Sequence, residues 1–155
     1  MTRTNLIFLA AGSSAALLIA ALGSQYLGGL APCELCIWQR WPHAAAVVLG
    51  GVALATAGPW APALGAAAGL GGAGIGVYHT GVERNWWDGP AACGAPSGIG
   101  GVTPEELLAQ IMAAPVVRCD EVAWEFLGLS MASWNALFSL ALAGIWGFAA
   151  LRSRP

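Results

Sequence analysis

Residues 32–57 read PCELCIWQRWPHAAAVVLGGVALATA, so a pair of cysteines leads directly into an apolar segment. Cys33 and Cys36 are separated by two residues, a spacing at which two thiols can close a small disulfide ring, and a position at a helix start lowers the pKa of a thiol. Arg40 follows one helical turn later, at the edge of a membrane span, where a charged residue usually has a function. The stretch therefore predicts a redox centre at a membrane surface. Because Cys-x-x-Cys also occurs in zinc sites and structural disulfides, the motif alone leaves its chemistry open.

The composition of the whole chain is that of a membrane protein. Of its 155 residues, 57% are hydrophobic and 9% are charged, and the mean hydropathy is +0.67. A soluble domain carries about 25% charged residues. The six basic residues are all arginine, and the net charge of −2 offers no basic surface for nucleic acid.

Four apolar segments are long enough to cross about 30 Å of hydrocarbon. They comprise about residues 6–27, 36–57, 63–79 and 132–151. The third contains mostly Gly and Ala, which contribute little transfer energy but allow close helix contacts. We therefore predict an all-α protein with a single domain over residues 1–155, folded as an integral membrane four-helix antiparallel bundle. The first segment also has features of a secretory signal peptide, but its apolar stretch is longer, so we interpret it as a retained span.

An even number of spans puts both termini on one side of the membrane. The arginines do not decide which side this is, because they lie near both surfaces. All four cysteines lie on the side opposite to the termini, and disulfides persist in the periplasm but not in a reducing cytosol. We therefore expect cytoplasmic termini and periplasmic cysteines.

The outer loop, about residues 80–131, is the only long polar region of the sequence. Within it, Thr103-Pro104-Glu105-Glu106 has the pattern of a helix N-cap, a proline at the first helical position and a capping box. We predict a short outer-loop helix over Thr103–Ala114 that ends at Pro115. This helix would either lie on the membrane surface or cover the end of the bundle.

Cys93 and Cys119 flank this part of the loop. A disulfide between them would close a loop of 27 residues, worth about 3.5 kcal/mol in the chain-entropy estimate. Such a bond could be a structural staple, but the Gly-rich sequence after Cys93 favours a thiol relay in which Cys93 moves. Arg118, next to Cys119, would favour that sulfur as a leaving thiolate. A zinc site of four cysteines is less favoured, since the second pair is 26 positions apart.

These features together resemble the DsbB family of disulfide-generating membrane oxidoreductases. The resemblance covers nearly the whole chain: four spans, Pro32-Cys33-x-x-Cys36-x-x-Gln39-Arg40, a second cysteine pair in the outer loop, and the segment Cys119–Met131 before the last span. His79 lies where the family has a histidine at the end of its third helix. The chain departs from familiar members in its short, Gly-rich loop around Cys93 and in its lack of lysine.

The resemblance implies an enzyme of the bacterial inner membrane, a protein-dithiol:quinone oxidoreductase. A reduced periplasmic thioredoxin-like partner of the DsbA type would attack a Cys93–Cys119 disulfide at Cys93. The electrons would then pass to Cys33 and Cys36, and from there to a membrane quinone, either ubiquinone or menaquinone. Two alternatives stay open on the sequence: a structural protein whose disulfides only brace its outer face, and a related oxidoreductase that runs in another direction or serves a dedicated partner.

Three residues are candidates for the quinone site: Cys36, Arg40 and His79. Arg40 is at i+4 from Cys36, so the two share one helix face, and its guanidinium can hold a thiolate and donate to a quinone oxygen. His79 would donate to a quinone oxygen, mainly on the resemblance, or would cap the end of its helix. We interpret His43, deeper in the second span, as a packing histidine. Gly69–Gly74 fits G-x-G-x-x-G, but it lies inside a span without a preceding strand, so it is not a dinucleotide site.

Overall fold

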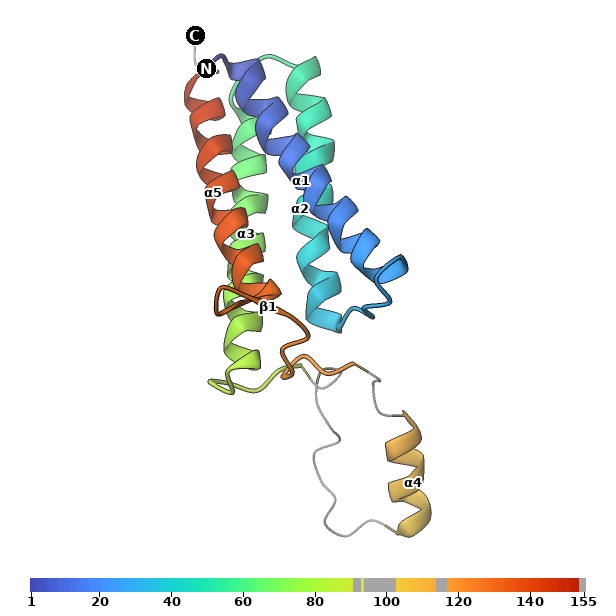
Figure 1. Cartoon of the computed structure of the whole chain (residues 1–155). Coiled ribbons are helices and arrows are strands. Elements are labelled where there is room, and N and C mark those ends of the chain that lie inside the picture. The colour runs from blue at the N-terminus through green and yellow to red at the C-terminus, as the bar shows by residue number, and fades with distance from the viewer. Residues whose placement is uncertain (91–92, 94–102, 114–116, 154–155) are drawn as a thin grey trace.

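The structure is a computed structural model that describes residues 1–90, 93, 103–113 and 117–153. Most of these residues form four long helices that lie side by side, with the two chain termini together at one end (Figure 1). The helices are α1 (Arg3–Tyr26), α2 (Glu34–Ala55), α3 (Trp60–Glu83) and α5 (Met131–Leu151). Helix α3 packs against α2 and α5, and α1 also packs against α2 and α5. In the described part of the chain, the only departure from an all-helical fold is a small antiparallel hairpin, β1 (Glu125–Phe126) and β2 (Leu129–Ser130).

The membrane-spanning character of the fold rests on three of these helices. Among the described residues, α1, α3 and α5 are long and apolar enough to cross a membrane. Helix α2 has 22 residues, but it carries Gln39, Arg40 and His43 in its first half. These polar side chains lower its hydropathy, so α2 is the one predicted span that composition does not support by itself. Its polar residues face other helices, as described below.

Three of the four long helices, α1, α2 and α5, begin at side-chain caps that the sequence supplies. Thr2 accepts a hydrogen bond from the Asn5 amide, Cys33 from the Cys36 amide and Ser130 from the Ser133 amide. A side chain in this position satisfies one of the amides that a helix start leaves without a partner. A cysteine of the redox motif therefore also begins α2.

Close packing between α3 and α5 depends on the glycines of α3. A Cβ atom on Gly65 would lie 2.5 Å from the Trp146 ring, and one on Gly76 would lie 2.9 Å from Ala136. The Gly- and Ala-rich composition of this segment predicted such close contact. Gly69–Gly74, which fits the G-x-G-x-x-G pattern, is part of this packed helix.

The four helices are most tightly joined at the end that carries the termini. Leu6, Ile7 and Trp146 form part of a buried cluster there. Arg3 Nη2 donates to the Ala53 carbonyl at 2.7 Å, and Arg3 Nε donates to Ser153 Oγ at 2.7 Å. From this end, α1 diverges from α5 toward the cysteines (Figure 1).

The predicted outer helix is present as α4 (Pro104–Ala113). Its capping box is formed, because the Glu106 amide donates to Thr103 Oγ1 at 3.3 Å and the Thr103 amide donates to Glu106 Oε2 at 2.9 Å. Figure 1 shows α4 projecting away from the four long helices, so it does not cover their ends. That α4 lies on the membrane surface stays a prediction. Pro115 and the Gly-rich run after Cys93 lie outside the described residues.

Candidate functional site

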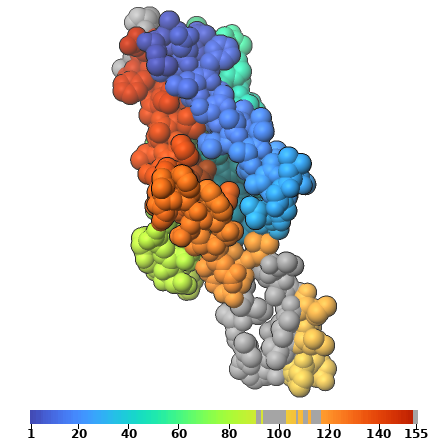
Figure 2. Space-filling model, viewed as in Figure 1, coloured from blue at the N-terminus to red at the C-terminus, as the bar shows by residue number. Residues whose placement is uncertain are grey.

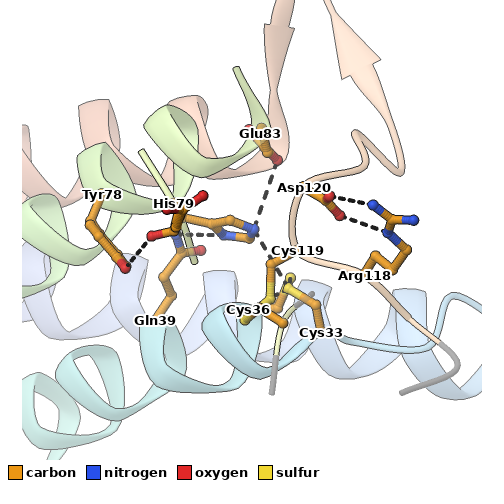
Figure 3. Close-up of a disulfide and its surroundings, with 11 residues drawn as sticks. Cys33, Cys36, Gln39, Tyr78, His79, Glu83, Arg118, Cys119 and Asp120 are labelled. Carbon is orange, nitrogen blue, oxygen red and sulfur yellow. Dashed lines mark hydrogen bonds and ion pairs between the residues drawn. A yellow bond between two sulfur atoms is a disulfide. The ribbon is translucent and has the colours of Figure 1, made fainter. Parts of the chain in front are cut away.

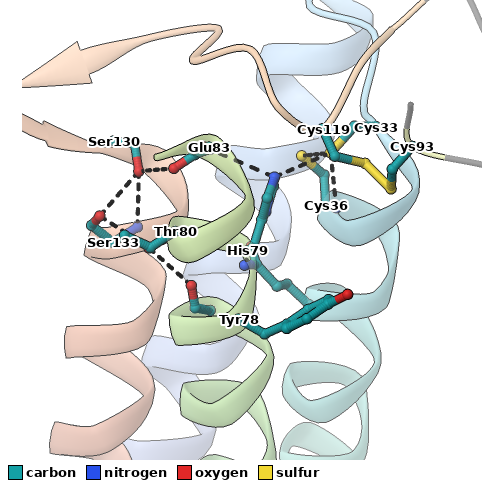
Figure 4. Close-up of polar contacts among 12 residues, drawn as sticks. Cys33, Cys36, Tyr78, His79, Thr80, Glu83, Cys93, Cys119, Ser130 and Ser133 are labelled. Carbon is teal, nitrogen blue, oxygen red and sulfur yellow. Dashed lines mark hydrogen bonds and ion pairs between the residues drawn. A yellow bond between two sulfur atoms is a disulfide. The ribbon is translucent and has the colours of Figure 1, made fainter. Parts of the chain in front are cut away.

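All four cysteines lie together at the end of the molecule opposite the termini. Cys93 and Cys119 form a disulfide, with their Cα atoms 4.9 Å apart, and Cys33 and Cys36 are unbonded. Cys33, Cys93 and Cys119 share one buried cluster with Leu35 and Val82, and Cys36 packs against it. Figure 4 shows both pairs beside the first turn of α2. The fold therefore brings two cysteine pairs from distant parts of the sequence into one cluster.

The start of α2 gives Cys33 and Cys36 different surroundings. Cys33 Sγ donates to Cys36 Sγ at 2.7 Å and accepts from the Cys36 amide at 3.2 Å. The hydrogen bond to Cys36, together with burial, raises the pKa of the Cys33 thiol well above its usual range. Only 4% of Cys33 is exposed, whereas Cys36 is half-buried. Cys36 is therefore the more available sulfur of the pair.

His79 lies beside Cys33 rather than beside Arg40. Its Nε2 is 3.6 Å from Cys33 Sγ and 3.9 Å from Glu83 Oε1, and its Nδ1 is 3.3 Å from Gln39 Nε2 (Figure 3). Glu83 in turn accepts a hydrogen bond from Ser130 Oγ (Figure 4). The histidine therefore connects the Cys33 thiol to a buried carboxylate one helical turn further along α3.

Arg40 lies on another side of the cysteine pair. Its Nη1 donates to Gln25 Oε1 at 2.7 Å, which joins the start of α2 to the last turn of α1. Arg40 also lines a cavity, together with Cys36, Gln39 and His43 of α2. As predicted from their i, i+4 spacing, Cys36 and Arg40 therefore share one face of the helix.

This cavity has a volume of about 440 Å³ and lies in the space that α1 and α5 leave between them. Figure 2 shows it as a hollow between α1, in blue, and the orange hairpin and first turns of α5, with atoms of α2 at its floor. Its wall is largely apolar, with α1 contributing Leu17, Leu18 and Ala21. Cys36 is the only cysteine in the wall among the described residues, and His79 is not part of it.

Aromatic rings form the opposite wall of the cavity. Ring centroids are 5.9 Å apart for Trp124 and Phe126, 6.3 Å for Phe126 and Trp134, and 5.7 Å for Trp134 and Phe138. Trp134 Nε1 donates to the Phe126 carbonyl at 3.0 Å, which holds the hairpin against α5. Offset and tilted rings of this kind suit a flat, apolar ligand.

Sequence reasoning missed several polar residues of this region. Glu83 and Asn135 are isolated polar residues in apolar helices, and such residues are costly unless they have a partner or a function. The two isolated polar residues are visible in the sequence, but their hydrogen-bond partners are not. Glu83 accepts a hydrogen bond from Ser130, and Asn135 accepts one from His43. His43, predicted as a packing histidine, is buried and hydrogen-bonded, but it also lies in the cavity wall.

Arg118 does not have the surroundings expected for a residue that stabilises a thiolate. Its guanidinium makes two hydrogen bonds to Asp120, of 2.9 and 2.5 Å, and lies 3.6 Å from Glu121 (Figure 3). The hydrogen bond from Arg118 holds the pKa of Asp120 below its usual range. Two carboxylates therefore already offset the positive charge next to Cys119.

Comparison with known proteins gives a consistent result. The family model "Disulfide bond formation protein DsbB" matches residues 3–149. Disulfide bond formation protein B of Xanthomonas oryzae pv. oryzae (strain MAFF 311018) is 36% identical, over 90% of this chain and 87% of its own length. The protein of the same name from Hahella chejuensis (strain KCTC 2396) is 30% identical, over 100% and 97%. The one from Methylococcus capsulatus (strain ATCC 33009 / NCIMB 11132 / Bath) is 38% identical, over 83% and 82%.

No solved structure matches the chain. The family match nevertheless covers α1, α2, α3, all but the last two residues of α5, and both cysteine pairs. The chain therefore belongs to the DsbB family, the membrane proteins of disulfide bond formation.

Proposed function

We propose that this protein is a protein-dithiol:quinone oxidoreductase of the bacterial inner membrane. It oxidises a periplasmic thioredoxin-like dithiol protein of the DsbA type and delivers the two electrons to a membrane quinone. Its four long helices span the membrane as an antiparallel bundle, with both termini in the cytoplasm and the cysteines in the periplasm. The polar side chains of α2 are tolerated in this arrangement because they face the cavity and the neighbouring helices.

One observation carries this proposal: two cysteine pairs share a buried cluster, and Cys36 of the inner pair also lines an apolar cavity. A brace would need the disulfide but not a second, unbonded pair against it. A thiol relay needs both pairs within reach of each other, together with an exit for electrons. The cavity beside Cys36 provides that exit.

The transfer consists of two disulfide exchanges. A thiolate of the partner attacks Cys93, the Cys93–Cys119 bond breaks, and Cys119 leaves as a thiolate. The second thiol of the partner then displaces Cys93 and completes the partner's disulfide. Cys119 attacks an oxidised Cys33–Cys36 bond at Cys33, its neighbour in the buried cluster, and Cys36 leaves as a thiolate. Cys93 then displaces Cys33 from Cys119, so the outer disulfide is restored and the inner pair holds two electrons.

The residues around Cys36 fit a quinone. When bound, a quinone accepts two electrons and two protons and becomes a quinol. The cavity of about 440 Å³ has aromatic and aliphatic walls, as a flat apolar ring requires. Arg40 offers a guanidinium for an oxygen that gains negative charge. Asn135 also lines the cavity, and its Nδ2 has no hydrogen-bond partner in the described structure, so its amide keeps an unused donor.

His79 and Glu83 are placed to handle the protons that thiol oxidation releases. His79 Nε2 lies 3.6 Å from Cys33 Sγ, within the range of a sulfur hydrogen bond, and it can accept a proton when Cys33 becomes part of a disulfide. Glu83 lies 3.9 Å from the same nitrogen and can stabilise the resulting cation. In this proposal His79 acts on the thiol side of the site rather than on a quinone oxygen.

The test is an oxygen-free assay with the purified full-length protein, a reduced DsbA-type partner and a soluble ubiquinone analogue. We expect partner oxidation and quinone reduction in a one-to-one ratio, and no turnover without quinone. Cys36→Ser should abolish the reaction. A protein whose disulfides only brace its outer face would leave partner and quinone unchanged, and that result would overturn the proposal.

A further inference from the structure

We propose that Asn135 and His43 form a second, inner contact for the quinone ring. Asn135 Nδ2 donates a hydrogen bond to the carbonyl oxygen that lies deeper in the cavity, and His43 fixes the orientation of the Asn135 amide. The inference rests on the proposed function, because it takes the cavity beside Cys36 as the quinone site. It adds a contact on α5, far in sequence from the cysteine motif.

The amide of Asn135 is satisfied on one side only. Its Oδ1 lies 2.9 Å from His43 Nε2, so the imidazole N–H donates to it. Its Nδ2 is buried and has no hydrogen-bond partner in the described structure. A buried donor without a partner costs about 1–3 kcal/mol, and such groups in native proteins are rare. A ligand that offers an acceptor oxygen would remove this cost.

The position of Asn135 shows where this ligand must lie. Asn135 and His43 both line the cavity that also contains Cys36 and Arg40. Ser139 Oγ lies 3.4 Å from the same imidazole nitrogen, so it is a second neighbour of His43 and not a partner of Asn135 Nδ2. Asn135 lies in the wall of this largely apolar cavity, so a ligand with an acceptor oxygen on an apolar ring is the kind that would complete its amide.

The two polar contacts of the cavity lie at different depths. Cys36, Arg40 and His43 occupy positions i, i+4 and i+7 on one face of α2. Arg40 is about 6 Å and His43 about 10.5 Å along the helix axis from Cys36. The two carbonyl groups of a para-quinone lie on opposite edges of its ring. Arg40 near the cysteines and Asn135 beside His43 therefore match the outer and the inner carbonyl oxygen.

His43 is a positioning residue in this site. Its N–H occupies Asn135 Oδ1, and this contact directs Nδ2 away from His43. Without the imidazole, the amide could rotate and place its oxygen toward the ligand, where it would repel a carbonyl oxygen. A glutamine at this position keeps a donor nitrogen at similar reach, and a leucine does not.

The first test measures affinity with the full-length protein in detergent. Decylubiquinone and menadione are titrated separately by quenching of tryptophan fluorescence. For the analogue that wild-type protein binds, we expect Asn135→Leu and His43→Leu to raise Kd about tenfold, the loss of one good hydrogen bond. His43→Gln should stay within about twofold of wild type. Ser14→Ala, which removes a buried hydroxyl outside this cavity, is the matched control.

The second test uses infrared spectra of wild-type protein with a quinone that carries ¹³C at one or the other carbonyl carbon. Both carbonyl bands of the bound quinone should lie below the frequency of the free quinone in detergent. Asn135→Leu should return one of the two bands to that frequency. If that variant does not fold, the wild-type spectrum still decides: a single shifted carbonyl overturns the inference. Unchanged affinity in Asn135→Leu would overturn the inference alone, whereas failure of wild-type protein to bind either analogue would overturn the proposed function as well.

Discussion

At the scale of single residues, Arg40 connects the thiol chemistry to the cavity. Gln25 at the end of α1 accepts a hydrogen bond of 2.7 Å from one guanidinium nitrogen, which holds the side chain at the cavity wall. The guanidinium has five N–H groups, so the contact with Gln25 leaves several for a ligand oxygen. Since Arg40 and Cys36 share a helix face, this cation is well placed to stabilise charge that develops during electron transfer.

We therefore expect Arg40→Ala to impair quinone use and to leave thiol exchange with the partner intact. The kcat/KM for quinone should fall by about 10- to 100-fold, because a methyl group cannot replace a charge-assisted hydrogen bond. The rate of a single turnover between partner and outer disulfide should change little. Arg84→Ala is the control, because this arginine lies over the Trp86 ring, away from the cavity. Unchanged quinone kinetics in Arg40→Ala would remove Arg40 from the site.

The two inner cysteines should also differ in reactivity. Cys33 is buried, and its hydrogen bond to Cys36 raises the pKa of its thiol, so it stays protonated at neutral pH. Cys36 is half-buried and lines the cavity. In protein with a reduced inner pair and an intact outer disulfide, iodoacetamide should modify Cys36 at least about tenfold faster than Cys33, because only thiolates react. Mass spectrometry of peptides after timed quenching measures this ratio, and preferential labelling of Cys33 would contradict it.

The residues that the sequence predicted are those whose chemistry is local. The Cys33–Cys36 motif and the i+4 position of Arg40 are visible in one stretch of chain, and the structure keeps Cys36 and Arg40 on one face of α2. The contacts of His79 with Cys33 and of Asn135 with His43 join helices that are far apart in sequence. They depend on how α3 and α5 rotate against α2, which a single sequence does not reveal.

At the scale of elements, the long helices were predictable because each needs enough apolar residues to cross a membrane. The ends of these helices were less predictable. Helix α3 begins at Trp60 and continues to Glu83, beyond the expected 63–79, because Pro62 is tolerated in a first turn and the last turn packs on the cysteines. The hairpin of β1 and β2 was missed, since its two-residue strands give no periodic pattern.

The contact between α3 and α5 offers a test of this packing. A Cβ atom on Gly65 would lie 2.5 Å from the Trp146 ring, which is fully buried. Gly65→Ala should therefore force α3 and α5 apart and destabilise the protein by about 1–3 kcal/mol. Gly71→Ala on the same helix is the matched control, because no atom lies within 4 Å of its added Cβ. Thermal unfolding in detergent should show a lower Tm for Gly65→Ala only; equal Tm values would disprove the close contact.

At the scale of the whole molecule, the two ends of the long helices differ in how closely they pack. The end with the termini is closed by the Arg3 hydrogen bonds and the cluster around Trp146. At the opposite end α1 diverges from α5 (Figure 1). The cavity and the four cysteines lie at this end. In the proposed function, the partner and the quinone would both meet the protein at this more open end.

The outer disulfide is less accessible than the sequence suggested. Cys93 is 1% exposed and Cys119 is 0% exposed, since both are covered in the cluster with Val82. Exchange requires an accessible sulfur, so Cys93 or Cys119 must become exposed before a partner can attack. In the sequence, the small and turn-forming residues Gly89-Pro90-Ala91-Ala92 precede Cys93, whereas Cys119 lies a dozen residues before α5.

We therefore expect Cys93 to be the sulfur that meets the partner. In Cys119→Ser, the Cys93 thiol should displace thionitrobenzoate from a DsbA-type partner that lacks its resolving cysteine and carries thionitrobenzoate on the other. The products are free thionitrobenzoate and a covalent complex through Cys93, detectable on a non-reducing gel and by mass spectrometry. Cys93→Ser, which leaves the Cys119 thiol, should form the complex at least about tenfold more slowly, because Cys119 is held against the helix ends. If the complex instead forms through Cys119 or Cys33, with Cys93 dispensable, the order of the relay is different: the partner would then enter at the buried cluster itself, and the small residues before Cys93 would have no part in docking.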